Sequence, residues 1–221
     1  LNVHNRYLHE GIVAFGERLT MLHHPGIESV VFSCSGTEAN EVALRMAREF
    51  TGRRGIVCTD AAYHGSSGLV DTLTYRGRHL SSGSVRTFPY PDCFRPFCHA
   101  TDDESLAEVT LAAASDAVDA LQRDDAGFAA LIVCPIFANE GLPRLPRDFM
   151  RRLTDLTHAA GGLLIADEVQ SGYGRTGDWW SYSADGYAPD IVVSGKPMGN
   201  GLPLAATAAS RDCVERFRSA T

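Results

Sequence analysis

Two short apolar runs that end in charged residues most constrain how this chain of 221 residues can fold. Residues 163–166 are apolar and short enough for a buried strand, and Asp167 follows them directly. A second run, residues 191–194, leads into Gly195 and Lys196. Both charged residues therefore follow the carboxyl end of a predicted strand, which is where α/β folds place ligand chemistry.

Lys196 and Asp167, taken together, favour one kind of site. Lys196 lies between Gly195 and Pro197, with Gly199 just beyond, so it is expected on a tight, irregular turn. A lysine amine is the nucleophile of Schiff-base enzymes, and pyridoxal 5'-phosphate (PLP) sites pair it with an acid facing the pyridine nitrogen. For either residue alone, a surface lysine or a helix-capping carboxylate is the ordinary alternative. The two motifs in this order favour the PLP site.

The motifs around these residues resemble those of a known enzyme family. Asp167-Glu-Val-Gln170, the glycine-rich residues 172–177, and Ser194-Gly-Lys-Pro-Met-Gly-Asn-Gly201 are similar to the motifs of class III aminotransferases, PLP enzymes of fold type I. The last motif looks most like the alanine–glyoxylate aminotransferase-like subgroup, which also contains phospholyases of phosphorylated amino alcohols. The resemblance covers nearly the whole chain. It implies that residues 1–221 are the PLP-binding large domain of a longer protein, without its N-terminal part and C-terminal small domain.

Apolar runs alternate with amphipathic stretches along the chain. The runs predict strands at residues 29–33, 55–58, 84–88, 128–133, 163–166, 191–194 and 203–209. The amphipathic stretches predict helices at residues 4–22, 37–50, 102–123 and 147–160, and another from about residue 212. This alternation predicts an α/β fold with a doubly wound, mostly parallel sheet flanked by helices.

The segment that follows the first predicted strand has the features of an anion site. Ser35 can cap the next helix, and Glu38 three residues later completes the pattern of a capping box. The backbone amides of Gly36 and Thr37, the Thr37 hydroxyl and the helix dipole would then face an anion. A plain capped helix is the alternative. In the resembling family, the Ser35-Gly36-Thr37 element binds the PLP phosphate.

The resemblance also implies the contacts of the PLP ring. Tyr63 would stack on the pyridine ring with His64 beside it, and flat rings gain stacking energy of about 1 kcal/mol. Val169 would pack on the opposite face of the ring, and Gln170 would hydrogen-bond the ring hydroxyl. Each of these residues follows a predicted strand end. The pattern is therefore what one shared site requires.

The implied function is a PLP-dependent transaminase that moves an amino group between an amine or amino acid and a keto acid or aldehyde. Lys196 would form the Schiff base and move the proton, while Asp167 would keep the pyridine nitrogen protonated. Two alternatives remain at this stage. One is a phospholyase that eliminates phosphate from phosphorylated amino alcohols with the same cofactor residues, and the other is an inactive dimerising fragment.

One position departs from the family pattern. Cys134-Pro-Ile-Phe-Ala138 stands where many class III aminotransferases have Glu-Pro-Val-Gln-Gly. In several of them this glutamate helps to sort α-amino from ω-amino substrates by pairing with an arginine. Asn139 and Glu140 are nearby, but in a shifted register. The sequence therefore leaves the amino donor and acceptor open.

A homodimer is expected, because the resembling family is dimeric with the active site at the subunit interface. The irregular residues 66–100 fit such an interface, since long loops within a domain are usually functional or lie between subunits.

The first predicted helix carries an apolar stripe made of Leu8, Ile12, Phe15, Leu19 and Leu22.

Composition and cysteine usage exclude several other classes of protein. A net charge of −7 argues against a nucleic-acid or anionic membrane partner, and no apolar run approaches the ~20 residues of a membrane span. No signal peptide is recognisable. The six cysteines are expected to be free thiols in a reducing, cytoplasmic compartment. Cys93, Cys98 and His99 lack the second ligand pair of a zinc site, so no metal is predicted.

Overall fold

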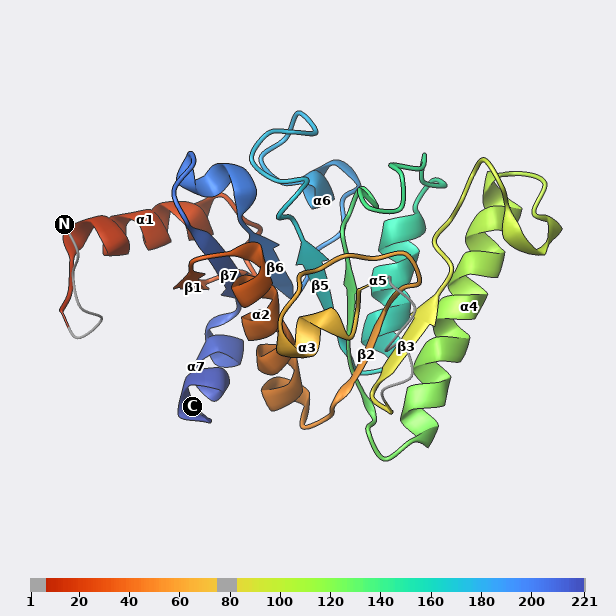
Figure 1. Ribbon diagram of the computed structural model, residues 1–221, viewed down its shortest axis with the longest axis horizontal. Helices are drawn as coiled ribbons and strands as arrows, with labels where there is room; N and C mark the ends of the chain where they lie inside the picture. The colour runs from red at the N-terminus through yellow and green to blue at the C-terminus, as the bar shows by residue number, and fades with distance from the viewer. Residues whose placement is uncertain (1–6, 75–82, 221) are drawn as a thin grey trace.

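The computed structural model describes residues 7–74 and 83–220, which build a seven-stranded sheet flanked by helices (Figure 1). The strand order is β1-β7-β6-β5-β4-β2-β3. Only β7 runs against its neighbours, and every other pair in the sheet is parallel. The strands are β1 (Ser29–Ser33), β2 (Gly55–Thr59), β3 (Val85–Phe88), β4 (Phe128–Val133), β5 (Leu163–Asp167), β6 (Ile191–Ser194) and β7 (Ala205–Ala209).

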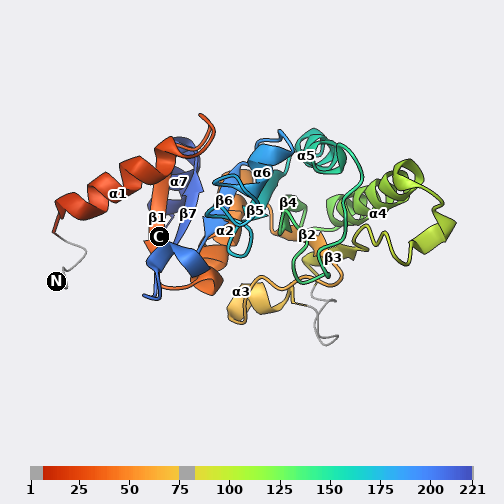
Figure 2. The same ribbon diagram turned by 90° about the horizontal axis from the view of Figure 1, so that it is seen from above.

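Helices cover both faces of this sheet. They are α1 (Glu10–Met21), α2 (Gly36–Thr51), α3 (Gly68–Asp71), α4 (Asp103–Arg123), α5 (Phe149–Ala159), α6 (Ser181–Ala184) and α7 (Arg211–Ser219), with short 3-10 turns η1 (Phe97–His99) and η2 (Lys196–Gly199). One face packs against α4, α5 and the end of α1, and the other against α2 and α7. Figure 2 shows α4 and α5 on one side of the sheet and α2 and α3 on the other. The predicted doubly wound α/β fold is confirmed.

The central strands form because their residues are apolar without interruption. All six residues of β4 are buried, since a parallel sheet with helices on both faces exposes neither side of a strand. Leu131 and Val133 enter one core, whereas Ile132 between them enters the core on the opposite face. Such runs are recognisable in the sequence, and the predicted strands match the observed ones to within about two residues.

The apolar stripe of the first predicted helix has an unexpected environment. Residues 4–6 of that prediction lie outside the described residues, and α1 begins at Glu10. Of the stripe, only Leu19 is buried, whereas Leu8 is 95% and Ile12 is 52% exposed. Phe15 stacks on Phe32 of β1, with 5.4 Å between ring centroids. Much of this apolar face is therefore uncovered within one chain.

The cysteines are free, as expected, and no disulfide is present among the described residues, which include all six. Cys58, Cys134 and Cys213 are buried, whereas Cys34, beside the end of β1, is exposed. No helix in residues 7–74 and 83–220 combines the length and the apolar character that crossing a bilayer requires.

The end of α1 is joined to the rest of the fold by a buried imidazole, and this contact should make stability depend on pH. The His23 ring stacks on Trp180 at 4.2 Å, and its Nδ1 lies 3.0 Å from the Tyr182 hydroxyl. Burial, together with the adjacent His24, lowers the pKa of His23 from 6.5 to about 3. Below pH 6.5, the His23 imidazole therefore binds a proton in the unfolded chain but not in the folded chain. The stability that neutral His23 contributes is present above pH 6.5 and is lost as pH falls toward 3.

We expect His23→Phe, which keeps a stacking ring but cannot be protonated, to flatten the acid side of the stability curve. Between pH 6.5 and 4 the parent should lose up to about 1.4 kcal/mol of unfolding free energy per pH unit more than the variant. Urea titrations at several pH values measure this slope. His99→Asn, a change at an exposed histidine, should leave the slope unchanged. Equal slopes for His23→Phe and the parent would contradict the assignment.

Candidate active site

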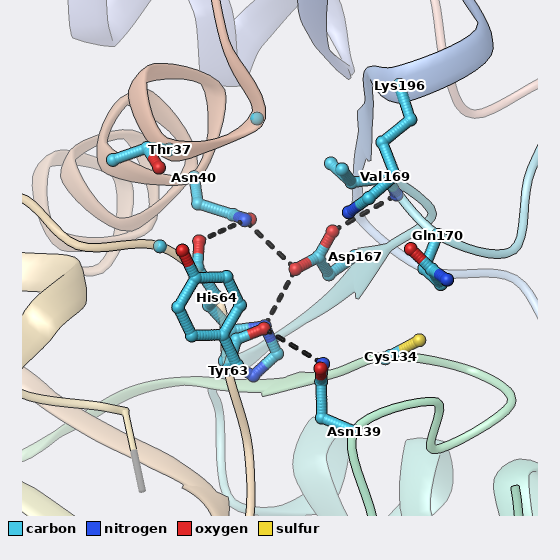
Figure 3. A pocket seen from close by; sticks show the side chains of 12 residues that line it. Thr37, Asn40, Tyr63, His64, Cys134, Asn139, Asp167, Val169, Gln170 and Lys196 are labelled. Carbon is cyan, nitrogen blue, oxygen red and sulfur yellow. Dashed lines mark hydrogen bonds and ion pairs between the residues drawn. The ribbon is translucent and has the colours of Figure 1, made fainter. Parts of the chain in front are cut away.

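The predicted site residues gather around a cavity of about 180 Å³ at the carboxyl edge of the sheet (Figure 3). This edge receives the ends of β2, β5 and β6 and the N-terminus of α2. The cavity is lined by Gly36, Thr37, Asn40, Tyr63, His64, Gly65, Cys134, Asn139, Asp167, Val169, Gln170 and Lys196. Every residue named as a site residue from the sequence is among them except Ser35.

Asp167, the last residue of β5, is only 5% exposed and accepts three hydrogen bonds. Its Oδ2 accepts from Asn40 Nδ2 at 2.9 Å and from His64 Nδ1 at 2.8 Å. Its Oδ1 accepts from the backbone amide of Val169 at 3.1 Å. Burying a carboxylate is unfavourable unless it is hydrogen-bonded, and these three donors meet that requirement. Because a carboxylate only accepts, Nδ1 of His64 carries the hydrogen.

Asn40 was not recognised as a site residue from the sequence. It lies in the second turn of α2, is 1% exposed, and also donates from Nδ2 to the His64 carbonyl at 2.8 Å. Both partners are acceptors, so the orientation of the amide is determined by chemistry. A signal did exist: Asn40 shares the buried stripe of α2 with Ala43, Leu44 and Ala47, where a polar side chain is rare.

Lys196 begins the turn η2 that follows β6, and its side chain extends into the cavity toward Asp167 (Figure 3). Its backbone has φ of +28°, a value that residues with a side chain rarely adopt. Gly195 before it is buried, and Lys196 itself is exposed. The lysine is thus presented from a strained, irregular turn, as the glycine-rich motif predicts.

Glycines allow Val169 to form one wall of the cavity. A Cβ at Gly36 would lie 2.8 and 2.9 Å from the two Val169 methyl groups, closer than real Cβ atoms come, and one at Gly195 would lie 3.4 Å from the same side chain. On the other side, a Cβ at Gly65 would lie 2.8 Å from Thr37 Oγ1, and φ there is +141°. At Gly36 and Gly65 the elements meet this closely only because these positions lack side chains, whereas a Cβ at Gly195 would make ordinary contact.

Residues 35–37 open α2, although one detail differs from the prediction. Ser35 caps the helix, because its Oγ accepts from the Glu38 amide at 3.2 Å. The Glu38 carboxylate reaches back to the amide of Cys34 at 2.7 Å, rather than to that of Ser35 as in a capping box. The side chain of Ser35 is therefore engaged by the helix, while Gly36 and Thr37 line the cavity at the positive end of the helix dipole.

Tyr63 and Gln170 lie on opposite sides of Asp167 in Figure 3. The Tyr63 side chain is 47% exposed, and its backbone carbonyl accepts from Asn139 Nδ2 at 3.3 Å. Glu140, beside Asn139, does not line the cavity; its carboxylate accepts a hydrogen bond from Thr59 at the end of β2.

Cys134 is a buried, neutral thiol in the cavity wall. Burial, reinforced by the nearby charge of Asp167, raises the pKa of Cys134 to about 12. Among the residues that line the cavity, Asp167 is the only carboxylic acid. The position at which many class III aminotransferases carry glutamate is therefore uncharged here.

A second buried carboxylate went unrecognised in the sequence. Glu168 is fully buried, and its carboxylate accepts hydrogen bonds from the hydroxyls of Ser171 and Ser181 and from the amide of Tyr182 at 3.0 Å. Burial raises its pKa, and these donors oppose that rise. Glu168 thereby holds the glycine-rich loop after β5 against α6.

Comparisons with known proteins agree with this geometry. The family model described as Aminotransferase class-III matches residues 2–221, and the chain belongs to this family. It is 36% identical over 207 residues to ethanolamine-phosphate phospho-lyase homolog 1 of Caenorhabditis elegans, covering 86% of this chain and 44% of that protein. It is 35% identical over 204 residues to the mitochondrial alanine–glyoxylate aminotransferase 2 homolog 2 of Arabidopsis thaliana, covering 90% and 41%.

A solved structure shares the fold as well. A phospholyase from Arthrobacter in complex with phosphoethanolamine superimposes with a TM-score of 0.91 at 35% identity, covering 100% of this chain and 53% of that one. The chain thus has the fold of class III enzymes of fold type I. It spans about half the length of the curated relatives it matches.

The contact between Gly36 and Val169 should be measurable as a loss of stability. Gly36→Ala places a methyl group where the Val169 methyls lie, so we expect the free energy of unfolding to fall by about 1–3 kcal/mol. Urea unfolding measures the loss. The double variant Gly36→Ala/Val169→Ala should be more stable than the sum of the single effects, because the second change removes the clash.

Gly16→Ala is the matched control for this experiment. Gly16 is also helical, but its added Cβ would only reach ordinary contact with Phe32 at 3.9 Å. This variant should be as stable as the parent or slightly more stable, since alanine favours helix. Full additivity of the Gly36 and Val169 changes would show that the clash is absent.

Proposed function

We propose that the chain is the cofactor-binding part of a PLP-dependent transaminase, which moves an amino group between an amine or amino acid and a keto acid or aldehyde. One observation carries this proposal: Lys196 and the triply hydrogen-bonded Asp167 face the same cavity. Membership of the class III family supports it.

The residues around the cavity fit PLP. Residues 35–37 would bind its phosphate at the N-terminus of α2, where backbone amides and the helix dipole favour an anion. The ring would lie between Tyr63 and Val169, with its hydroxyl toward Gln170. Two buried atoms of cavity-lining residues, Asn40 Oδ1 and His64 Nε2, have no hydrogen-bond partner in the described part of the chain. Unpartnered buried polar atoms are expected where a polar ligand completes a site.

Lys196 and Asp167 would have different roles in the proposed reaction. PLP, when bound, supplies an electron sink for the carbanion that forms when a substrate loses its Cα proton. Lys196 would hold the cofactor through its amine and, once a substrate amine displaces it, move the proton at the substrate Cα. Asp167 would keep a proton on the pyridine nitrogen, and its three donors hold the carboxylate in one orientation.

A phospholyase is the second candidate. The observation that favours it is the Arthrobacter phospholyase structure, since this likeness extends over the entire chain at 35% identity. The uncharged Cys134 also suits an anionic substrate such as a phosphorylated amino alcohol, because a carboxylate at this position would repel its phosphate. Both reactions would use the same lysine and acid, so the products decide between them.

We also propose that the protein acts as a homodimer in the cytoplasm. The exposed apolar side chains of Ile12 on α1 and of Leu8 just before it support a subunit interface, and Leu142, Trp179 and Leu202 are further exposed apolar side chains. In Figure 1, α1 lies at the same end of the molecule as β1 and β7. The six free cysteines support a reducing compartment, which fractionation of cells would test.

In the full-length protein, we expect borohydride to attach PLP covalently to Lys196, as identified by mass spectrometry of peptides. Lys196→Ala should abolish the attachment and lower turnover by at least about 10³-fold, because the nucleophile and the proton carrier are both lost. Retention of covalent PLP in Lys196→Ala would contradict the assignment of this residue.

The same preparation separates the two candidate reactions. A transaminase forms a new amino acid from a keto acid acceptor and an amine, whereas a phospholyase releases inorganic phosphate and ammonia from phosphoethanolamine. Amino acid formation without phosphate release supports the main proposal. Phosphate release in the absence of a keto acid would replace it with the phospholyase.

The dimer should depend on the exposed apolar side chains at and just before the start of α1. We expect the double variant Leu8→Asp/Ile12→Asp to sediment as a monomer in analytical ultracentrifugation while the parent sediments as a dimer, because charge on a buried interface is unfavourable. Ala112→Asp on α4 adds a carboxylate to an exposed helical position and should remain dimeric. A dimeric Leu8→Asp/Ile12→Asp variant would place the interface elsewhere.

A further inference from the structure

Asn40 connects three parts of the chain that meet at the cavity. Its backbone belongs to α2, whose N-terminus carries Gly36 and Thr37. Its Nδ2 donates both to the carboxylate of Asp167 at 2.9 Å, at the end of β5, and to the carbonyl of His64 at 2.8 Å, in the segment after β2. One amide group therefore joins the proposed phosphate-binding helix, the aromatic segment and the acid (Figure 3).

The position has strict chemical requirements. Asn40 is 1% exposed, and removing its amide would leave the His64 carbonyl without this donor and Oδ2 of Asp167 with His64 alone. An aspartate of the same shape would lose the donor and set a second carboxylate against Asp167, and like charges at this distance repel strongly. Leucine fills a similar volume but donates nothing. Only a neutral side chain with two N–H groups satisfies both acceptors at once.

The amide also limits how the Asp167 carboxylate can turn. Oδ2 is held by Asn40 and His64, and Oδ1 is held by the amide of Val169. Without Asn40, the single contact from His64 to Oδ2 would remain, and this imidazole would lose the donor that holds its own backbone carbonyl. Two of the four hydrogen bonds in this part of the site thus come from the Asn40 side chain.

We propose that Asn40 is a positioning residue, which fixes the orientation of the Asp167 carboxylate that would face the pyridine nitrogen of PLP, and holds the His64 segment in register with it. This inference rests on the proposed function as a PLP enzyme. Asn40 acts through Asp167 and takes no part in the chemistry itself.

A matched control distinguishes the positioning role of Asn40 from a purely structural one. Thr207 of β7 donates from Oγ1 to the carbonyl of Ala39 at 2.7 Å, and it is as fully buried as Asn40. Thr207→Val therefore removes a buried hydrogen bond to the adjacent residue of α2 without touching Asp167. If Asn40 only anchors the helix, Thr207→Val and Asn40→Ala should have the same consequences.

The experiment uses the full-length protein reconstituted with PLP that carries ¹⁵N in the ring, so that NMR reports whether the ring nitrogen is protonated. We expect Asn40→Ala to lower the pH at which this nitrogen loses its proton by about one unit or more, and to weaken PLP binding by about tenfold. Thr207→Val should lower thermal stability and leave both quantities as in the parent. An unchanged ring titration in Asn40→Ala, or an equal change in Thr207→Val, would overturn the proposal.

Two additions keep the test decisive. Asn40→Asp preserves the shape of the side chain, so it can be used if Asn40→Ala does not fold. In this variant, the pH at which the PLP ring nitrogen loses its proton should differ from that in the parent at least as much as in Asn40→Ala. In cofactor-free protein, the ¹³C signal of the Asp167 carboxyl should move in both Asn40 variants and stay constant in Thr207→Val. That signal tests the contact even if Lys196 proves not to bind PLP. Failure of the proposed function and failure of this inference are therefore distinguishable.

Discussion

The parallel pairing of β5 with β6 is the constraint on which the rest of the structure depends. Asp167, the last residue of β5, lies opposite Val193, and Lys196 follows three residues later. Because parallel neighbours end at the same edge of a sheet, an acid and an amine 29 residues apart in sequence (196 − 167) meet at one cavity. The connection between the strands is itself anchored, since the buried Glu168 ties the glycine-rich loop to α6.

Close approach and polar satisfaction then shape the cavity. Gly36 leaves room for Val169, and Gly65 leaves room for Thr37. Burying Asp167 would be unfavourable by itself, so the fold surrounds it with donors from three different segments. The result is a site lined by glycines, Val169 and several polar side chains, with Asp167 and Lys196 as its carboxylate and its amine.

Sequence reasoning reached the fold and most of the site because both leave local patterns. Buried parallel strands are uninterrupted apolar runs, and the charged residues that end β5 and β6 are visible directly after them. The family resemblance then supplied the remaining cavity residues except Asn40, Gly65 and Asn139, of which Asn139 had been noted only as a neighbour of Cys134. The roles assigned to these residues are still predictions.

What sequence reasoning could not supply depends on contacts between distant segments. The partner of Asn40 lies 127 residues further along the chain, so no periodicity reveals it. The apolar stripe of the first predicted helix correctly indicated an amphipathic helix, but an apolar pattern does not say what covers it, and Leu8 and Ile12 are exposed in one chain. In the same way, the capping pattern at Ser35 did not show that Glu38 reaches Cys34 instead.

The separation between Asn40 and Asp167 also has a consequence for how the protein becomes functional. Contacts over such distances close large loops and tend to form late in folding, whereas β6, the lysine turn and β7 are contiguous and form a local unit. A ligand that needs both the amine and the acid binds only the completed chain and stabilises it by mass action. Supply of the cofactor during synthesis would then favour the molecules that have folded correctly.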